Sequence, residues 1–230
     1  MRPTGRLHLG HYFSNIVPGL NGAAVLIANY HAPEEQNTEQ IIQLLRKFGV
    51  TDIRLQRDVY NAELYFQLLS IASIGDLARM TQYKAAEEAT RTAQLLTYPV
   101  LMAHDVAGFQ EILVGIDQQQ HLEYAAKLLK KYNRKFDANY TIPKANIVVG
   151  RVKDLREPSK KMSKSSPQGC LFLDDSADEI KSKLRKAVMT DEGRENLVFL
   201  YGEFVGGEVP ESNLTLKDQL AEALLKKFTF

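Results

Sequence analysis

The feature that most constrains the fold is a short apolar run that ends in polar residues and is followed by an amphipathic helical pattern. Residues 25–29 have the composition of a strand buried on both faces. A helix capped by Asn37 or Thr38 and closed by Gly49 follows, and residues 52–56 predict the next strand. Strand, helix and strand at this spacing predict a right-handed parallel unit of a doubly wound α/β sheet.

The second half of the chain repeats this alternation. It begins at residues 98–105, and the apolar run 112–115 predicts another buried strand. A long helix is predicted from residue 118 to about 132, and residues 147–149 predict a short strand. Ligands of open parallel sheets bind beyond the carboxyl ends of the strands, so Gly115 and the residues after it are candidates for a binding site.

A helical insertion is predicted at about residues 60–95, between the two halves. Its helical pattern breaks at Gly75 and Asp76 and resumes over 77–92. The apolar excess of residues 64–74 suits either the core or a subunit interface. A further helix begins near residues 174–176, residues 190–214 are predicted to be turn-rich, and a last amphipathic helix spans about 216–228.

Composition restricts the class of protein. A chain of 230 residues with 44% apolar residues can form one domain with an appendage, here 1–170 as the main domain and 171–230 as a helical region. The formal net charge of +1 argues against a protein that coats nucleic acid. The lone cysteine, Cys170, excludes an internal disulfide and suits a reducing cytoplasm. No apolar run reaches the ~20 residues of a membrane span.

The opening stretch, residues 3–11 (PTGRLHLGH), predicts a glycine-bearing turn that leads into a helix near His11. Gly10 has no Cβ, so its backbone can lie against a planar or phosphorylated ligand. The helix N-terminus offers unpaired N–H groups to an anion. His8 and His11 are three residues apart and can both donate hydrogen bonds to phosphate oxygens.

A second stretch, residues 161–165 (KMSKS), places Lys161 and Lys164 on a serine-containing loop. Each stretch alone has an ordinary explanation: a tight turn with two exposed histidines, or a solvated run of charge. Between them lies a strand end that carries Gly115 and Asp117, and a carboxylate there can accept a hydrogen bond from a ribose hydroxyl. In this order, the two stretches predict the two halves of an ATP clamp.

Five ordered motifs resemble class I aminoacyl-tRNA synthetases, and the stretches between the two signatures are more similar to the tryptophanyl-tRNA synthetases. The motifs are residues 2–12, 78–84, 97–103 with Asp105, 115–121 and 157–165. The similarity covers residues 1 to about 202 with interruptions, and the chain resembles a shortened member. The resemblance implies a Rossmann-like catalytic domain and a homodimer.

The resemblance also implies a two-step reaction. The carboxylate of L-tryptophan attacks the α-phosphorus of ATP, which gives tryptophanyl-adenylate and pyrophosphate, and the aminoacyl group then passes to tRNA. ATP is the expected cofactor, with Mg²⁺ bound through its phosphates and not through protein side chains.

By the family pattern, the expected catalytic residues are His8, His11, Lys161 and Lys164. The expected ATP-binding residues are Thr4, Gly10, Gly115, Asp117, Met162, Ser163 and Ser165. The expected amino-acid-binding residues are Tyr98, Met102, Asp105 and Gln118.

Asp105 carries the argument for specificity. An indole offers one donor, its N–H, and a buried carboxylate can accept it while Met102 packs against the ring. Asp105 falls three residues after Met102, so both can face one pocket if this turn is helical. An ion-paired or helix-capping aspartate is the ordinary alternative. The phenol of tyrosine, the substrate of the sister family, can also donate to an aspartate.

Two departures from the family pattern leave alternatives open. The family has a central strand before the opening turn, and its carboxyl-terminal helical region is longer than the one here. The expectation is that the native start lies upstream of Met1 or that the chain is a pared-down paralogue. Three functions are therefore compatible with the sequence: charging of tRNA with tryptophan, adenylate formation with poor charging of tRNA, and non-catalytic binding.

Overall fold

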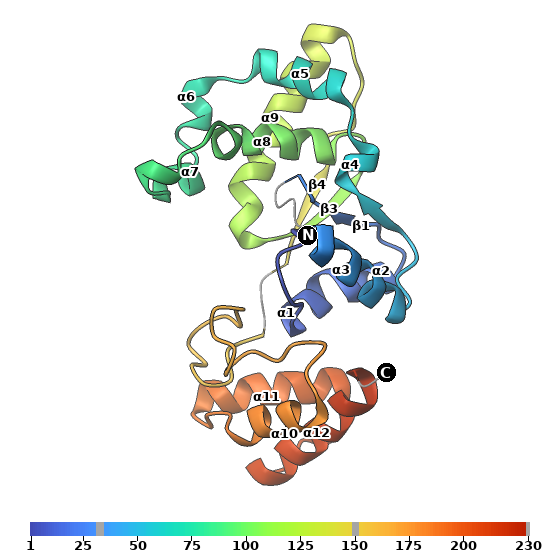
Figure 1. Ribbon diagram of the computed structural model, residues 1–230, viewed down its shortest axis with the longest axis vertical. Coiled ribbons are helices and arrows are strands. Elements are labelled where there is room, and N and C mark those ends of the chain that lie inside the picture. Colours follow the sequence, from blue (N-terminus) through green and yellow to red (C-terminus); the bar gives the residue numbers. More distant parts are fainter. Residues whose placement is uncertain (31–34, 149–151, 229–230) are drawn as a thin grey trace. The chain divides into compact units, whose positions relative to one another are not determined.

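The computed structural model describes residues 1–30, 35–148 and 152–228, without the side chains of residues 35, 36, 117 and 148 (Figure 1). Its first half contains α1 (Leu9–His11), the π-helix η1 (Tyr12–Ile16), α2 (Val17–Leu20), β1 (Val25–Ile27), α3 (Glu35–Lys47), β2 (Ile53–Leu55), α4 (Gln56–Val59), α5 (Ala62–Ile71), α6 (Ile74–Leu77), α7 (Thr81–Ala85) and the 3-10 helix η2 (Glu88–Thr90). Its second half contains α8 (Ala93–Val106), β3 (Glu111–Gly115), the 3-10 helix η3 (Ile116–Gln118), α9 (Gln119–Phe136), β4 (Lys144–Val148), α10 (Ala177–Arg185), α11 (Asp191–Phe204) and α12 (Asn213–Phe228).

The chain forms two compact units. Unit 1 comprises Met1–Arg2, Leu26–Pro33 and Arg54–Val149, and unit 2 comprises Pro3–Val25, Glu34–Ile53 and Gly150–Phe230. Both predicted signature stretches belong to unit 2, whereas the predicted amino-acid-binding residues belong to unit 1. The predicted domain division at residue 170 stays a prediction.

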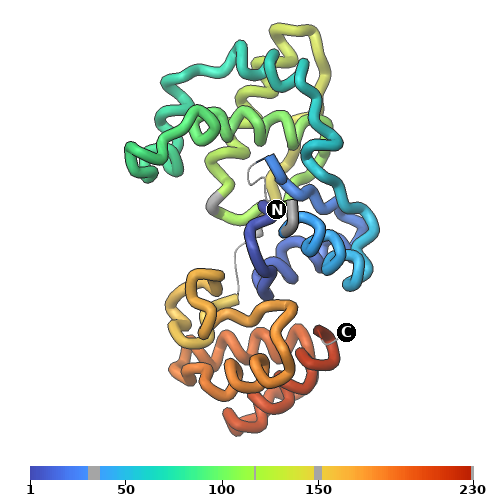
Figure 2. The backbone as a smooth tube through the Cα atoms, in the orientation of Figure 1, coloured from blue at the N-terminus to red at the C-terminus, as the bar shows by residue number. Residues whose placement is uncertain are grey.

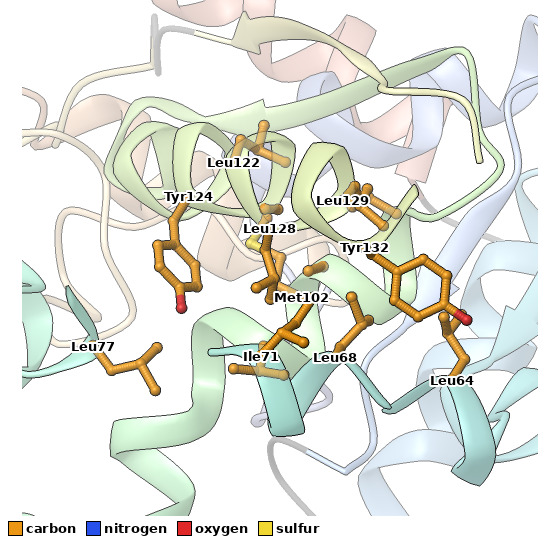
Figure 3. Close-up of a cluster of buried hydrophobic side chains, with 14 of the residues drawn as sticks. Leu64, Leu68, Ile71, Leu77, Met102, Leu122, Tyr124, Leu128, Leu129 and Tyr132 are labelled. Atoms are coloured by element: carbon orange, nitrogen blue, oxygen red, sulfur yellow. The ribbon is translucent and has the colours of Figure 1, made fainter. Parts of the chain in front are cut away.

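Unit 1 is built on a parallel pair of strands and a helical core. β3 pairs with β4 in a register that sets Glu111 opposite Lys144 and Gly115 opposite Val148. Helices α5, α8 and α9 pack on one another through a single apolar cluster (Figure 3). Leu68 and Leu129 are fully buried in it, because each helix presents one apolar stripe.

Unit 2 is held by aromatic rings and by three carboxyl-terminal helices. The backbone trace shows α10, α11 and α12 side by side (Figure 2). Tyr12 of η1 contacts the rings of Phe48, Phe204 and Phe228, with centroids 5.9, 5.5 and 5.4 Å away. Offset and edge-on ring pairs of this kind add to the gain from apolar burial. These ring contacts pack η1 against α11 and α12.

The strands β1 and β2 are hydrogen-bonded neighbours, as the predicted strand–helix–strand pattern requires. Met1 lies beside β1: its amino group donates to the carbonyl of Leu26, and its carbonyl accepts from Ala28 N–H at 2.8 Å. In the described residues the strands form two separate two-stranded sheets.

Most predicted elements are confirmed and four details are wrong. The helix predicted over 77–92 is replaced by the short pieces α7 and η2. Residues 190–214, predicted as turns, contain α11, because Thr190 caps that helix and buried leucines outweigh its two glycines. The cap predicted at Asn37 or Thr38 lies inside α3. β3 is not fully buried, since Leu113 is exposed. No helix in the described residues has the length and apolar character to cross a membrane.

Candidate functional site

The opening turn has the backbone geometry that its glycines allow. Gly5 has a φ of +63°, a left-handed conformation that glycine adopts without strain. A Cβ on Gly10 would lie 2.7 Å from the ring of His8, so Gly10 makes room for an imidazole of the same motif. The family resemblance implies room for adenine instead, which no contact here tests.

Both histidines of this turn have a defined tautomer. Nδ1 of His8 accepts the N–H of Gly10 at 3.0 Å, and Nδ1 of His11 accepts the N–H of His8 at 3.2 Å. Because each Nδ1 accepts a hydrogen bond, each neutral ring carries its proton on Nε2. The capping box at the start of α1 therefore leaves two Nε2–H donors, which suit phosphate oxygens.

The electrostatic environment keeps these rings neutral. Burial, together with the smaller effects of the charges of Lys164 and Lys161, lowers the pKa of His8 to about 4. Burial also lowers the pKa of His11 to about 3, with smaller contributions from His8 and the two lysines. The histidine pair and the lysine loop thus act on one another within unit 2.

The lysine loop is anchored from inside. Met162 is buried and its N–H donates to the carbonyl of Val152 at 3.0 Å, while Lys161 is exposed. Nζ of Lys164 donates to the carbonyl of Thr4, so the loop contacts the opening turn directly. The hydroxyls of Ser163 and Ser165 lie 3.0 Å apart. Met162 is predicted to bind ATP, and its side chain is part of the core of unit 2.

A further link fastens the opening turn to the segment after the lysine loop. Leu9 N–H donates to the carbonyl of Leu171 at 3.0 Å, and Leu173 N–H donates to that of Leu7 at 2.9 Å. The fully buried carboxylate of Asp175 binds Arg6 at 3.0 Å and Lys183 at 2.6 Å. This ionic link holds the segment after residues 161–165 against the opening turn.

Asp105 lies in a helical turn, as predicted, and within a polar network of unit 1. Its Oδ2 accepts from Nε2 of Gln56 at 2.6 Å, and its Oδ1 lies 3.1 Å from Nδ1 of His104. Gln56 in turn accepts the N–H of Tyr30 at 2.9 Å, and Nε2 of His104 accepts the N–H of Asn61 at 2.9 Å. The side chain of Asp105 is 8% exposed.

The other predicted amino-acid-binding residues divide into two groups. The hydroxyl of Tyr98 donates to Oε1 of Gln118 at 3.2 Å, so these two are brought together. Met102 points into the apolar cluster with Leu68 and Leu128 (Figure 3). The structure gives Met102 a packing role, and its contact with a ligand ring stays a prediction.

Gly115 ends β3, and Asp117 follows in η3, at the carboxyl end of the strand as predicted. The side chain of Asp117 lies outside the described part of the structure, so its ribose contact stays a prediction.

Sequence reasoning missed the residues that hold the site residues in place. Gln56 follows β2 directly, and a fully buried glutamine at a strand end is a signal only once its burial is known. Arg6 and His104 carry no spacing signal. Asp175 lies 169 residues from Arg6, and Asn61, which His104 binds through Nε2, lies 43 residues from it.

Comparison with known proteins identifies the family. Residues 22–228 match the family described as tRNA synthetases class I (W and Y). The tryptophan--tRNA ligase of Bacillus anthracis is 32% identical over 92% of this chain and 75% of its own length. That of Caldanaerobacter subterraneus is 30% identical over 100% of this chain and 84% of its own length.

Solved structures agree with this match. Tryptophanyl-tRNA synthetase from Mycoplasma pneumoniae superposes with a TM-score of 0.80 at 26% identity, over 100% of this chain and 84% of that one. Tyrosyl-tRNA synthetase from Archaeoglobus fulgidus, at 17% identity and a TM-score of 0.79 over 100% of this chain and 86% of that one, shares the fold. The predicted Rossmann-like class is confirmed. The chain belongs to the class I tRNA synthetases of the tryptophan and tyrosine group.

Proposed function

We propose that this chain uses ATP to activate L-tryptophan as tryptophanyl-adenylate and then transfers the aminoacyl group to tRNA. The observation that carries the activation step is the pair of Nε2–H donors on His8 and His11, held neutral beside the two cations of the lysine loop. The names of the curated relatives, tryptophan--tRNA ligases, support tryptophan as the amino acid.

Adenylate formation requires the chain to stabilise charge more than to form covalent bonds with the substrate. The carboxylate of tryptophan attacks the α-phosphorus, and pyrophosphate leaves with negative charge spread over its oxygens. Lys161 and Lys164 stabilise that charge, and the two histidines donate to phosphate oxygens without changing protonation. Thr4, Gly10, Ser163 and Ser165 lie on the same two stretches and complete the ATP-binding set.

The phosphates of ATP would hold Mg²⁺, which would neutralise part of their charge. Buried Met162 sets the position of the lysines by anchoring the loop from inside. We assign the ribose to Gly115 and Asp117, and the polar end of tryptophan to Tyr98 and Gln118.

Asp105 selects the side chain. A buried carboxylate that is already held by neighbouring donors accepts the indole N–H, and the apolar surroundings of α8 favour the ring. The same group could accept the phenol O–H of tyrosine, so the two amino acids must be compared directly.

Pyrophosphate–ATP exchange, run with tryptophan and with tyrosine side by side, tests this function. We expect exchange that depends on tryptophan and is at background with tyrosine. Tyrosine-dependent exchange would reassign the substrate, and no exchange with either would remove the catalytic proposal. Aminoacylation of total tRNA then separates full charging from adenylate formation alone.

We also propose a homodimer in the cytoplasm. Leu64, Leu68 and Ile71 are buried in the core of unit 1, so the apolar excess of this region serves the core first. Phe66 and Ile74 remain 64% and 74% exposed and are the candidates for a subunit contact.

A further inference from the structure

We propose that His104 is a positioning residue for amino-acid specificity: it orients the carboxylate of Asp105 toward the ring N–H of the substrate. This inference rests on the proposed function and adds a residue to it. His104 and Asp105 are neighbours near the end of α8, and their side chains are 3% and 8% exposed. A buried polar pair of this kind is fixed by its hydrogen bonds.

The proton of His104 can be placed from its partners. Nε2 accepts the backbone N–H of Asn61 at 2.9 Å, so the neutral ring carries its proton on Nδ1. Nδ1 lies 3.1 Å from Oδ1 of Asp105 and therefore donates to it. Asn61 is itself fixed as the N-cap of α5, where its Oδ1 accepts the N–H of Leu64 at 3.0 Å.

A second donor fixes the other oxygen of the carboxylate. Gln56 is fully buried, and its Nε2 donates to Oδ2 of Asp105 at 2.6 Å. The orientation of the Gln56 amide is set because its Oε1 accepts the N–H of Tyr30 at 2.9 Å. Because each oxygen faces a donor, the plane of the carboxylate is defined, and a carboxylate oxygen can accept two hydrogen bonds.

Orientation matters because a hydrogen bond weakens steeply when its angle departs from linear. Without a donor on Oδ1, the carboxylate of Asp105 would turn more easily about its terminal torsion, which is a broad and soft one. His104 removes that freedom before the substrate binds, which is the usual advantage of a preorganised acceptor. The ring of Tyr60, with its centroid 5.0 Å from that of His104, packs against the imidazole and limits its movement.

Two substitutions separate this role from a structural one. His104→Asn keeps an N–H donor near the position of Nδ1, and His104→Gln keeps an acceptor near the position of Nε2. Dissociation constants are measured by calorimetry for tryptophan and for β-(benzothiophen-3-yl)alanine, whose ring has sulfur in place of the N–H. The ratio of the dissociation constant of the analogue to that of tryptophan measures the contribution of the hydrogen bond from the ring N–H. The ratio for Asp105→Ala gives its value without this hydrogen bond.

We expect the parent protein to prefer tryptophan over the sulfur analogue, and Asp105→Ala to lose that preference. His104→Gln should lower the preference roughly 3- to 10-fold, the usual effect of one hydrogen bond, with little change in affinity for the analogue. His104→Asn should keep most of the parent's preference for tryptophan. Equal preference in both variants and the parent, or loss in the asparagine variant alone, would overturn the role of His104.

Other outcomes identify a failure of the proposed function itself. A parent protein that binds no tryptophan would contradict the proposed function. If the parent binds tryptophan and Asp105→Ala leaves the preference unchanged, Asp105 is not the acceptor, and the role of His104 falls while tryptophan activation is not contradicted. If the variants do not fold, ¹⁵N NMR of the histidines in the parent decides the question. A Nδ1–H tautomer for His104 supports the inference, and a Nε2–H tautomer contradicts it.

Discussion

At the scale of single residues, Lys164 is the residue whose removal should separate catalysis from amino-acid binding. Lys164→Ala removes one of two cations near the departing pyrophosphate, so we expect adenylate formation to fall ~100-fold or more. Tryptophan affinity measured without ATP should stay the same, because Asp105 and Tyr98 belong to the other unit. Lys160→Ala is the control: it removes an exposed lysine that pairs with Glu157, and exchange should change little.

The loss of tryptophan binding in Lys164→Ala would contradict a catalytic role of Lys164. The lysine loop would then be a structural element of unit 2, and its contact with the Thr4 carbonyl would be a packing contact only.

The histidine pair predicts how stability depends on pH. Burial lowers the pKa of His8 to about 4 and of His11 to about 3, while unfolded histidines titrate near 6.5. Between these pH values the unfolded chain binds more protons than the folded chain. The contribution of the two histidines to stability is therefore fully present above pH 6.5 and falls as the pH drops toward 4. Each histidine contributes at most about 1.4 kcal/mol per pH unit to this slope.

Urea denaturation across pH 4–7 measures that slope. His8→Asn keeps a side-chain oxygen that can accept the N–H of Gly10 but does not titrate, so the fall in the free energy of unfolding should become shallower. An unchanged slope would mean that His8 titrates near its ordinary value in the folded protein.

At the scale of elements, the link between the opening turn and the segment 170–176 predicts an asymmetry between two neighbouring aspartates. Asp175 is fully buried and binds both Arg6 and Lys183, whereas Asp174 is half exposed and binds Arg6. Asp175→Asn leaves Lys183 largely buried without its counter-charge and should cost about 1–3 kcal/mol of stability. Asp174→Asn, the matched control, should cost ~0–1 kcal/mol. Equal losses would show that burial of Asp175 does not strengthen its ion pairs.

Elements with a regular apolar period were predictable from the sequence. The stripe of α9 was placed within a few residues, because one face of that helix must meet the core, and β3 was placed from its continuous apolar run. The insertion was predicted poorly: residues 77–92 have helical composition, but Pro, Gly and cap signals are too sparse there to show where α7 and η2 end. α11 was missed because its glycines resemble a turn until the leucines of α12 cover it.

The residues of the candidate site also differ in how well the sequence predicts them. His8, His11, Lys161 and Lys164 were predictable, because a signature is local in sequence and is read without knowledge of contacts. Gln56 and His104 were not, because their importance comes from the partner Asp105, 49 residues beyond Gln56, and from burial. Supporting residues of this kind become visible only when the fold brings distant segments together.

At the scale of the whole molecule, the exposed apolar residues of the insertion predict assembly. Phe66 lies on α5 and Ile74 begins α6, and both expose most of their side chains while their neighbours Leu64 and Leu68 fill the core. Large exposed apolar side chains that lie close together in one region mark subunit contacts more often than chance, and self-association commonly follows two-fold symmetry. We therefore expect sedimentation velocity at micromolar concentration to show a dimer.

Charge placed on these residues should separate the subunits. Phe66→Glu combined with Ile74→Lys should shift the protein to a monomer with an unchanged melting temperature, because neither side chain is part of the core. Leu214→Glu is the matched control, since Leu214 is equally exposed but lies on α12, and it should leave the dimer intact. A parent protein that sediments as a monomer would restrict the insertion to its role in the core. A dimer that survives the double substitution would instead place the contact on another surface of the molecule.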